Sequence, residues 1–155
     1  MITQRSVSHA TFVIERVYAA SPARVFHAFA DPAIKARWFG ADDVSTTQYE
    51  LDFRIGGHET SRGSPTPGHT YLYDACYQDI VPDERIISTY EMFMDDVRIS
   101  VSVATVELKP EGSATRLVFT EQGAFLDGLD TPAQREHGTR ELLEGLAAEL
   151  ERTGP

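Results

Sequence analysis

The sequence has few of the residues that support disulfide, metal or membrane chemistry. Among 155 residues it has one cysteine, Cys76, which excludes a disulfide within the chain and is compatible with a reducing compartment. It has no run of 18 apolar residues, so we expect no membrane insertion. The N-terminus lacks the apolar stretch of a signal peptide. We therefore expect a cytoplasmic protein.

Positive charge is also scarce. The chain has 14 Lys and Arg residues against 24 Asp and Glu residues, a net charge of −10. Binding to nucleic acid needs a basic surface, so we expect no nucleic-acid partner and no docking on anionic membranes. The length and the ordinary composition, 41% hydrophobic and 25% charged, predict a single domain over residues 1–155 with a core at about 10–152.

Motifs of common catalytic sites are absent from the sequence. It contains no Gly-x-Ser-x-Gly, no His-Glu-x-x-His and no phosphate-binding glycine loop. His58 and His69 flank the breaker-rich loop at 64–68, but no third ligand follows at close spacing. Cys76 alternates with neighbouring tyrosines and is expected to point away from their face. The residues thus predict no metal and no cofactor, and they assign no catalytic residue.

The longest regular segment is a helix at 131–152. Thr131 and Gln134 form a Thr-x-x-Gln capping box around Pro132, and Gly154-Pro155 are expected to stop the helix. At about 100° per residue, one face is apolar. It consists of Leu142, Leu143, Leu146, Ala147 and Leu150. This face must pack against another element.

The rest of the chain predicts a sheet and two short helices. Residues 1–8 are polar and expected to fray, and a first strand follows at 10–20. Ser21-Pro22 and Asp31-Pro32 predict helices that end near Phe29 and at Trp38-Phe39-Gly40. Further strands are predicted at 46–55, 58–63, 69–80, 85–94, 97–108 and 114–122, with tight turns at Gly56-Gly57 and Asp95-Asp96. This order indicates an α+β fold with a meandering antiparallel sheet.

Several motifs resemble a known family. They are Phe12-x-Ile-x-Arg16, Ser-Pro-x-x-Val-Phe at 21–26, Asp52-x-Arg54-x-Gly56-Gly57 and Tyr77-x-Asp-Ile-Val-Pro-Asp-Glu-Arg85. Over about 10–151 the chain resembles the activator-of-heat-shock-protein-90-ATPase-like family of the START-like (SRPBCC) superfamily. The resemblance implies a helix-grip fold, in which a curved antiparallel sheet of six to seven strands wraps the long C-terminal helix, with two short helices after the first strand and a cavity between sheet and helix. It does not imply one chemistry, because members bind lipids, cyclise polyketides or assist chaperones.

One position departs from the pattern of this family. Many relatives have Gly-Trp where this chain has Gly138-Thr139. Replacing an indole by Thr on the buried helix face would leave space on the order of 100 Å³ unless a neighbour fills it. We hypothesise an enlarged cavity at Thr139, and Trp38 or a tyrosine packed against Thr139 with no void would contradict the hypothesis.

The candidate ligand-binding residues are those expected to face such a cavity. They are Trp38, Phe53, Tyr71, Tyr73, Tyr77, Tyr90, Phe119, Glu121, Thr139, Leu142, Leu143 and Leu146. The alternative is that the aromatic residues are ordinary core residues. Glu121 is the candidate buried carboxylate, whereas Asp52 and Arg54 are expected to form a structural ion pair beside the hairpin.

These features leave three interpretations of function. The first is a domain that binds a small hydrophobic molecule between the last helix and the sheet. The second is an enzyme of the polyketide cyclase or aromatase kind, in which Glu121, Arg54 and tyrosine hydroxyls steer proton transfer. The third is a co-chaperone-like interaction module with a chaperone partner. An exposed hydrophobic edge would also support a homodimer.

Overall fold

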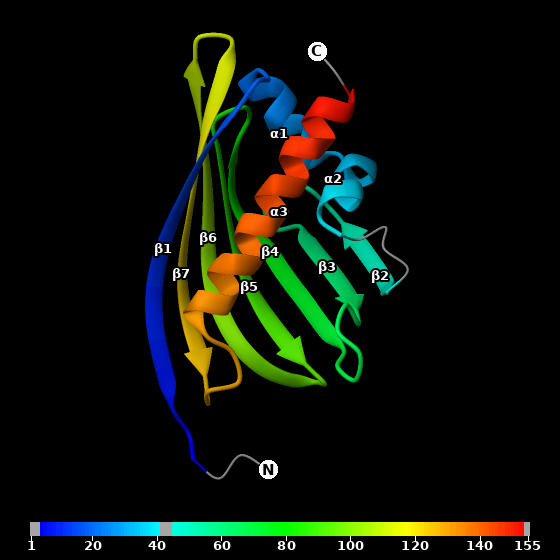
Figure 1. The fold of residues 1–155 in the computed structure, drawn as a ribbon, viewed down its shortest axis with the longest axis vertical. Coiled ribbons are helices and arrows are strands. Elements are labelled where there is room, and N and C mark those ends of the chain that lie inside the picture. The colour runs from blue at the N-terminus through cyan, green and yellow to red at the C-terminus, as the bar shows by residue number, and fades with distance from the viewer. Residues whose placement is uncertain (1–3, 41–44, 154–155) are drawn as a thin grey trace.

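The fold is a single curved sheet that holds one long helix. The structure, a computed structural model, describes residues 4–40 and 45–153. Seven antiparallel strands lie in the order β1-β7-β6-β5-β4-β3-β2. The elements are β1 (Val7–Tyr18), α1 (Pro22–Ala30), α2 (Pro32–Trp38), β2 (Thr46–Leu51), β3 (His58–Gly63), β4 (Tyr71–Val81), β5 (Arg85–Met94), β6 (Val97–Glu111), β7 (Ala114–Leu126) and α3 (Pro132–Thr153). Figure 1 shows α3 lying diagonally across the hollow face of the sheet, with α1 and α2 near its C-terminal end.

This arrangement is the predicted α+β helix-grip fold. The helix starts follow the predicted caps. Ser21 accepts a hydrogen bond from the Arg24 backbone, and Asp31 accepts two from the first turn of α2. None of the helices within the described residues is long and apolar enough to cross a membrane.

The cap of α3 differs in one detail from the predicted capping box. The Thr131 hydroxyl accepts a hydrogen bond from the Gln134 backbone N–H at 3.2 Å, as expected. The Thr131 backbone N–H, however, donates to Asp130 at 2.7 Å. Asp130 thus accepts the hydrogen bond from the Thr131 backbone N–H that the Gln134 side chain would accept in a capping box. The predicted stop at Gly154-Pro155 lies outside the described residues.

Three strands, β1, β6 and β7, are longer than the hydropathy pattern indicated, and β6 runs to Glu111 instead of residue 108. β1 begins at Val7 and β7 ends at Leu126, because the two strands pair continuously from Val7 opposite Leu126 to Tyr18 opposite Thr115. The prediction that residues up to 8 fray was therefore wrong at Val7 and Ser8. Backbone pairing extends a strand beyond its apolar core, and the hydropathy pattern does not record that pairing.

The predicted two-residue turn at Gly56-Gly57 was also wrong. β2 ends at Leu51, which pairs with Glu59, and residues 52–57 form the connection. The connection folds back on itself, so that a Cβ on Gly57 would lie 2.1 Å from the Asp52 carbonyl oxygen. Asp52 and Arg54 form the predicted ion pair at 2.8 Å, but they do so in this exposed connection and not in a strand.

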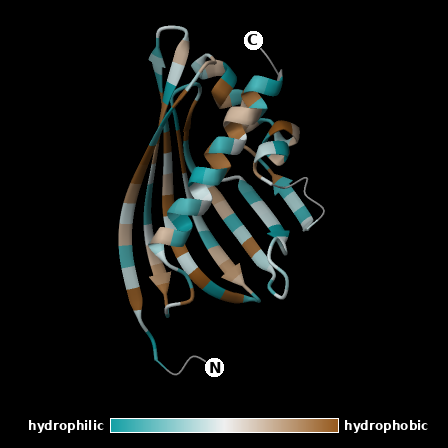
Figure 2. Ribbon diagram, in the orientation of Figure 1, coloured by the Kyte–Doolittle hydropathy of each residue, from teal (hydrophilic) through white to brown (hydrophobic). Residues whose placement is uncertain are grey.

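The core occupies one end of the space between helix and sheet. Side chains of β1, β7, α1 and α2 pack there on the C-terminal half of α3, including Ile14, Val25, Leu117 and Leu146, all almost fully buried. At the other end the buried face of β6 presents Ser100 and Ser102. Figure 2 shows how hydrophobic and hydrophilic residues alternate along the strands. Ser100 accepts a hydrogen bond from Arg135 in the first half of α3, so this end of the sheet meets the helix through a polar contact.

Candidate functional site

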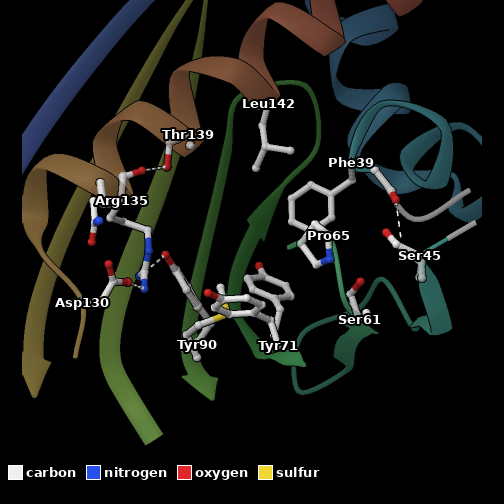
Figure 3. A pocket seen from close by; sticks show the side chains of 17 residues that line it. Phe39, Ser45, Ser61, Pro65, Tyr71, Tyr90, Asp130, Arg135, Thr139 and Leu142 are labelled. Carbon is white, nitrogen blue, oxygen red and sulfur yellow. Dashed lines mark hydrogen bonds and ion pairs between the residues drawn. The ribbon is translucent and has the colours of Figure 1, made fainter. Parts of the chain in front are cut away.

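A pocket of about 450 Å³ lies between the first half of α3 and strands β3, β4 and β5. Figure 3 shows its wall of rings and the helix residues above them. Tyr71 and Tyr73 come from β4, Tyr90 comes from β5, and Thr139 and Leu142 come from α3. The lining also includes the exposed residues Gly40, Pro65 and Gln134, so the pocket opens to solvent on that side.

A second, smaller cavity of about 90 Å³ adjoins this pocket on its inner side. The two share a boundary made of Phe39, Tyr73, Tyr90, Thr139 and Leu142. The inner cavity is then closed by buried side chains, which include Trp38, Tyr77, Leu143, Glu59 and Glu121. We call the two spaces the outer pocket and the inner cavity.

The aromatic walls support one another. The Tyr73 ring lies 4.8 Å from the Tyr90 ring and 5.3 Å from the Phe39 ring, centroid to centroid. Phe39 packs edge-on against Trp38 at 5.8 Å, and the Trp38 indole N–H donates to the Ala28 carbonyl at 2.9 Å. Rings held by several contacts lose little freedom when a ligand binds, so this wall is preorganised.

One buried ion cluster is centred on Glu59 of β3. Lys35 of α2 lies 3.1 Å from Glu59 Oε1, to which the Tyr77 hydroxyl donates at 2.8 Å. The Tyr49 hydroxyl donates to Oε2 at 2.6 Å. Burial, followed by the Glu59 charge, raises the pKa of Tyr49 and Tyr77 above the ordinary tyrosine value. The cluster holds one positive and one negative charge, and both carboxylate oxygens of Glu59 are hydrogen-bonded.

A second buried ion cluster is centred on Arg135 of α3. Its Nη1 donates to the Tyr90 hydroxyl at 2.8 Å and lies 3.3 Å from Glu121 Oε2. Its Nη2 donates to Asp130 at 2.8 Å and to Ser100 at 2.7 Å. Tyr90 in turn donates to Glu121 Oε2 at 2.7 Å. This cluster has two carboxylates for one guanidinium.

Several polar atoms beside the cavities keep hydrogen-bonding capacity, among them one oxygen of Glu121 and the Tyr73 hydroxyl. Within the described residues, neither Glu121 Oε1 nor the Tyr73 hydroxyl has a hydrogen-bond partner. Burial, followed by the charge of Glu59, raises the pKa of Tyr73 well above its ordinary value, so its hydroxyl stays protonated at neutral pH. The inner cavity is also lined by Ser88, whose hydroxyl has no hydrogen bond within the described residues, and by Lys35, so it offers an acceptor and several donors to a bound molecule.

Most of the predicted ligand-binding residues line these spaces. Tyr71, Tyr73, Tyr90, Thr139 and Leu142 line the outer pocket, and Trp38, Tyr77, Phe119, Glu121 and Leu143 are added by the inner cavity. Phe53 and Leu146 line neither. Phe53 packs instead between Phe26 and Tyr77, and Leu146 is fully buried in the core. Thr139 lies where the two spaces meet, and its hydroxyl donates to the Arg135 carbonyl at 3.0 Å.

Other predicted residues lie elsewhere. Arg54 is mostly exposed and lines neither space, so it has no place in a proton-transfer site there. His69 pairs with Asp95 at 2.6 Å, and His58 lies 4.0 Å from Asp74. In the described part of the chain, no group of three His, Cys, Asp or Glu residues could hold a metal ion. Cys76 is partly buried, with its sulfur 3.9 Å from the Tyr77 carbonyl.

Sequence reasoning missed the charged residues of both clusters except Glu121. Arg135 carried a usable signal, because it lies four residues before Thr139 and therefore on the same helix face. Lys35 lies three residues before Trp38, on the buried side of α2. Glu59 carried no signal, because β3 reads His-Glu-Thr-Ser-Arg-Gly and has no hydrophobic alternation.

Comparison with known proteins identifies the family. The profile of the family described as "Activator of Hsp90 ATPase homolog 1-like protein" matches residues 19–151. The solved structure of Mll3558 protein from Rhizobium loti is 54% identical, with 94% of this chain and 99% of that chain covered and a TM-score of 0.88. A protein from Rhizobium leguminosarum is 46% identical, with 97% of this chain and 99% of that chain covered and a TM-score of 0.92.

A more distant structure shares the fold alone. DynU16, a protein in the dynemicin biosynthetic locus, is 19% identical, with a TM-score of 0.66 over 94% of this chain and 48% of that chain. No curated protein matches this chain. The profile match spans both short helices, six of the seven strands and nearly all of α3. The chain therefore belongs to the family of Activator of Hsp90 ATPase homolog 1-like proteins and has its START-like helix-grip fold.

Proposed function

We propose that this protein binds a small hydrophobic molecule between α3 and the sheet. The observation that carries the proposal is the outer pocket, whose volume of about 450 Å³ is walled by Phe39, Tyr71, Tyr73 and Tyr90. Binding sites for small molecules are concave, mostly apolar spaces of about 300–1,000 Å³ with a few placed polar groups. The outer pocket has this size and this aromatic wall, with polar groups at Arg135 and Asp130 on one side and at Ser45 and Ser61 on the other (Figure 3).

Thr139 supports the proposal from the helix side. It is buried, and it borders both the outer pocket and the inner cavity. A tryptophan at this position would add a side-chain volume on the order of 100 Å³ at the junction of the two spaces. Thr139 therefore keeps open the space that a ligand would occupy.

The test is native mass spectrometry of the protein purified from its own host. We expect the wild-type protein to retain a small molecule that is released on unfolding. The variant Thr139→Trp should retain none, because its indole fills the junction. His137→Trp is the matched control, since it places the same residue on the exposed side of α3, where the native side chain is 75% exposed.

Two outcomes would count against binding. One is a wild-type protein without retained mass that also shows no thermal shift with hydrophobic ligands, since a ligand of the folded state raises the melting temperature. The other is equal retention by wild type, Thr139→Trp and His137→Trp, which would place the molecule outside the pocket.

Catalysis is a second candidate function, and the inner cavity provides the observation that favours it. Glu121 Oε1 and the Tyr73 hydroxyl, an acceptor and a protonated donor, both border the same buried space. Such a pair suits proton transfer of the cyclase kind. In heavy water, an enzyme should introduce deuterium at a carbon of the retained molecule, and Glu121→Gln should abolish this. A retained molecule whose carbon-bound hydrogens do not exchange would contradict catalysis and leave binding intact.

A further inference from the structure

The charge of the site indicates what kind of hydrophobic molecule it takes. We infer that the ligand carries a protonated amine, which enters the inner cavity and binds Glu121. This inference rests on the proposed binding function and adds the chemical class of the ligand.

The first argument is the charge balance around the two spaces. The charged residues that line them are Lys35, Arg135, Glu59, Glu121 and Asp130, which leave one negative charge in excess. Lys35 is matched by Glu59 at 3.1 Å. The excess therefore lies in the Arg135 cluster, where Glu121 and Asp130 share one guanidinium. An uncompensated charge beside a cavity is costly, and a ligand cation would balance it.

The second argument is the free oxygen of Glu121. The side chain is 1% exposed and lines the inner cavity. Its Oε2 receives hydrogen bonds from Tyr90 and Arg135, whereas Oε1 has no partner within the described residues. Oε1 is not among the fully enclosed oxygens without a partner in the described part of the chain, which are those of Thr60 and Ser102, so it meets the open space and offers a position for a donor. An ammonium group supplies both the donor and the missing charge.

The third argument is that both cations of the site already pair with carboxylates of the protein. Both terminal nitrogens of Arg135 are hydrogen-bonded to protein groups. The Lys35 ammonium lies 3.1 Å from Glu59 and 4.3 Å from the centroid of the Phe39 ring. A carboxylate or phosphate would have to share or displace an existing ion pair in a buried space. The site thus selects against anions of the same size.

The shape of the site agrees with a small head group on a ring-containing body. The inner cavity, at about 90 Å³, has room for an amine and one or two carbons. The outer pocket can hold an aromatic body against Tyr71 and Tyr73. The faces of aromatic rings also attract cations, which adds to the preference for an amine over a neutral group.

The test uses three probes that share a naphthalene ring and differ in the head group. They are 2-naphthylmethylamine, 2-naphthalenemethanol and 2-naphthoate, each titrated into the protein at pH 7 by isothermal titration calorimetry. We expect the amine to bind at least about tenfold more tightly than the carboxylate, with the affinity of the alcohol between the two. The reason is that one charge-assisted hydrogen bond raises the affinity about tenfold or more.

The variant Glu121→Gln should weaken binding of the amine about tenfold and change binding of the alcohol by less than about threefold. Glu141→Gln is the matched control, since it removes the same charge from an exposed position of α3 and should leave all three affinities unchanged. Asp130→Asn removes the other carboxylate paired with Arg135, and it should also weaken amine binding. If Glu121→Gln does not fold, Asp130→Asn serves as the test variant in its place.

The outcomes separate this inference from the proposed function. Tightest binding of the carboxylate, equal binding of all three probes, or unchanged amine affinity in both Glu121→Gln and Asp130→Asn would overturn the amine inference. If Thr139→Trp still blocked the probes in these cases, the binding function would stand. If none of the probes bound the wild-type protein, and no molecule were retained from the host, the binding function would fail as well.

Discussion

The two buried ion clusters of this protein look alike in composition but differ in balance. Glu59 is fully buried and has one cation, Lys35, with hydrogen bonds to both of its oxygens. Glu121 is equally buried, shares Arg135 with a second carboxylate and keeps one oxygen free. In the balanced cluster, both charges and both carboxylate oxygens already have partners within the protein. An unbalanced cluster beside a cavity remains able to bind something else.

This difference offers a way to tell buried charged residues that stabilise the fold from those that bind a ligand. Both clusters lie against the inner cavity, so burial alone does not distinguish them. The two clusters are distinguished by their net charge and by the number of hydrogen-bonding atoms that have no partner. We therefore expect variants of the Glu59 cluster to affect mainly stability and variants of the Glu121 cluster to affect mainly binding.

The largest expected effect follows from Glu59→Ala. It leaves the Lys35 ammonium buried without its carboxylate, and breaking a buried pair in this way costs about 3–5 kcal/mol. Urea denaturation should show this loss in the free energy of unfolding. The double variant Lys35→Met/Glu59→Leu should recover much of it, because no unpaired charge remains. A loss below about 1 kcal/mol in Glu59→Ala would show that the cluster is not structural.

A comparison of two leucines on α3 should sharpen the contrast between the packed end and the pocket. Leu146 is fully buried in the core, so Leu146→Ala should cost about 2–5 kcal/mol. Leu142 is only partly buried and borders existing space, so Leu142→Ala removes fewer contacts and should cost roughly half as much or less. Thermal or urea unfolding of both variants checks this. Equal losses would mean that the pocket wall is packed as tightly as the core.

Glu121→Gln should have a smaller effect on stability than Glu59→Ala. A glutamine oxygen can still accept from Tyr90, and Arg135 keeps its bond to Asp130 at 2.8 Å. We expect a change of about 1 kcal/mol in the free energy of unfolding, the size of one hydrogen bond. A loss as large as that of Glu59→Ala would remove the distinction between the two clusters.

The smallest expected effect concerns a third carboxylate, Glu149, at the other end of α3. Arg37 and Arg152 lie 2.8 and 3.1 Å from it, and the hydrogen bond from Arg37 is the main reason that its pKa lies below the ordinary value of 4.5. A lowered pKa in the folded state means stability that is present above about pH 4.5 and lost as the pH falls below it.

Thermal melts between pH 7 and pH 3 test this prediction. The wild-type melting temperature should fall with acid, and Glu149→Gln should fall less steeply below about pH 4.5. Asp95 and Asp127, whose pKa values are also lowered by hydrogen bonds from backbone N–H groups, should add the same acid sensitivity to both proteins. An identical slope in the two proteins would show that Glu149 contributes nothing to it.

The parts of the fold that could be predicted from sequence are those set by local contacts. The caps at Ser21, Asp31 and Thr131 were correct because capping joins residues two or three positions apart. The turn at Asp95-Asp96 was correct for the same reason, and both residues have the positive φ that such a turn needs. The prediction of a two-residue turn at Gly56-Gly57 was wrong. Gly57 lies instead where the connection passes close to the Asp52 carbonyl, which leaves no room for a side chain.

For the candidate site too, sequence reasoning was correct where local periodicity decides the position of a side chain. Periodicity placed Tyr71, Tyr73 and Tyr77 on one strand face and Thr139 on the apolar side of its helix, and these residues do border the cavities. The valines of β6 were a misleading signal, because Val101 is 40% exposed while Ser100 and Ser102 are buried. Neither serine lines the outer pocket or the inner cavity, and hydropathy alone cannot predict a space that side chains leave empty.

The sequence by itself determined the elements of this protein, because capping, helical period and strand alternation act over a few residues. Only the tertiary structure decided which charges meet. Lys35 and Glu59 are 24 residues apart, and Arg135 and Glu121 are 14 apart. The curvature of the sheet and the diagonal path of α3 bring these side chains together (Figure 1). The spare oxygen of Glu121 arises from that packing, since no local rule counts charges contributed by β7, α3 and the connection between them.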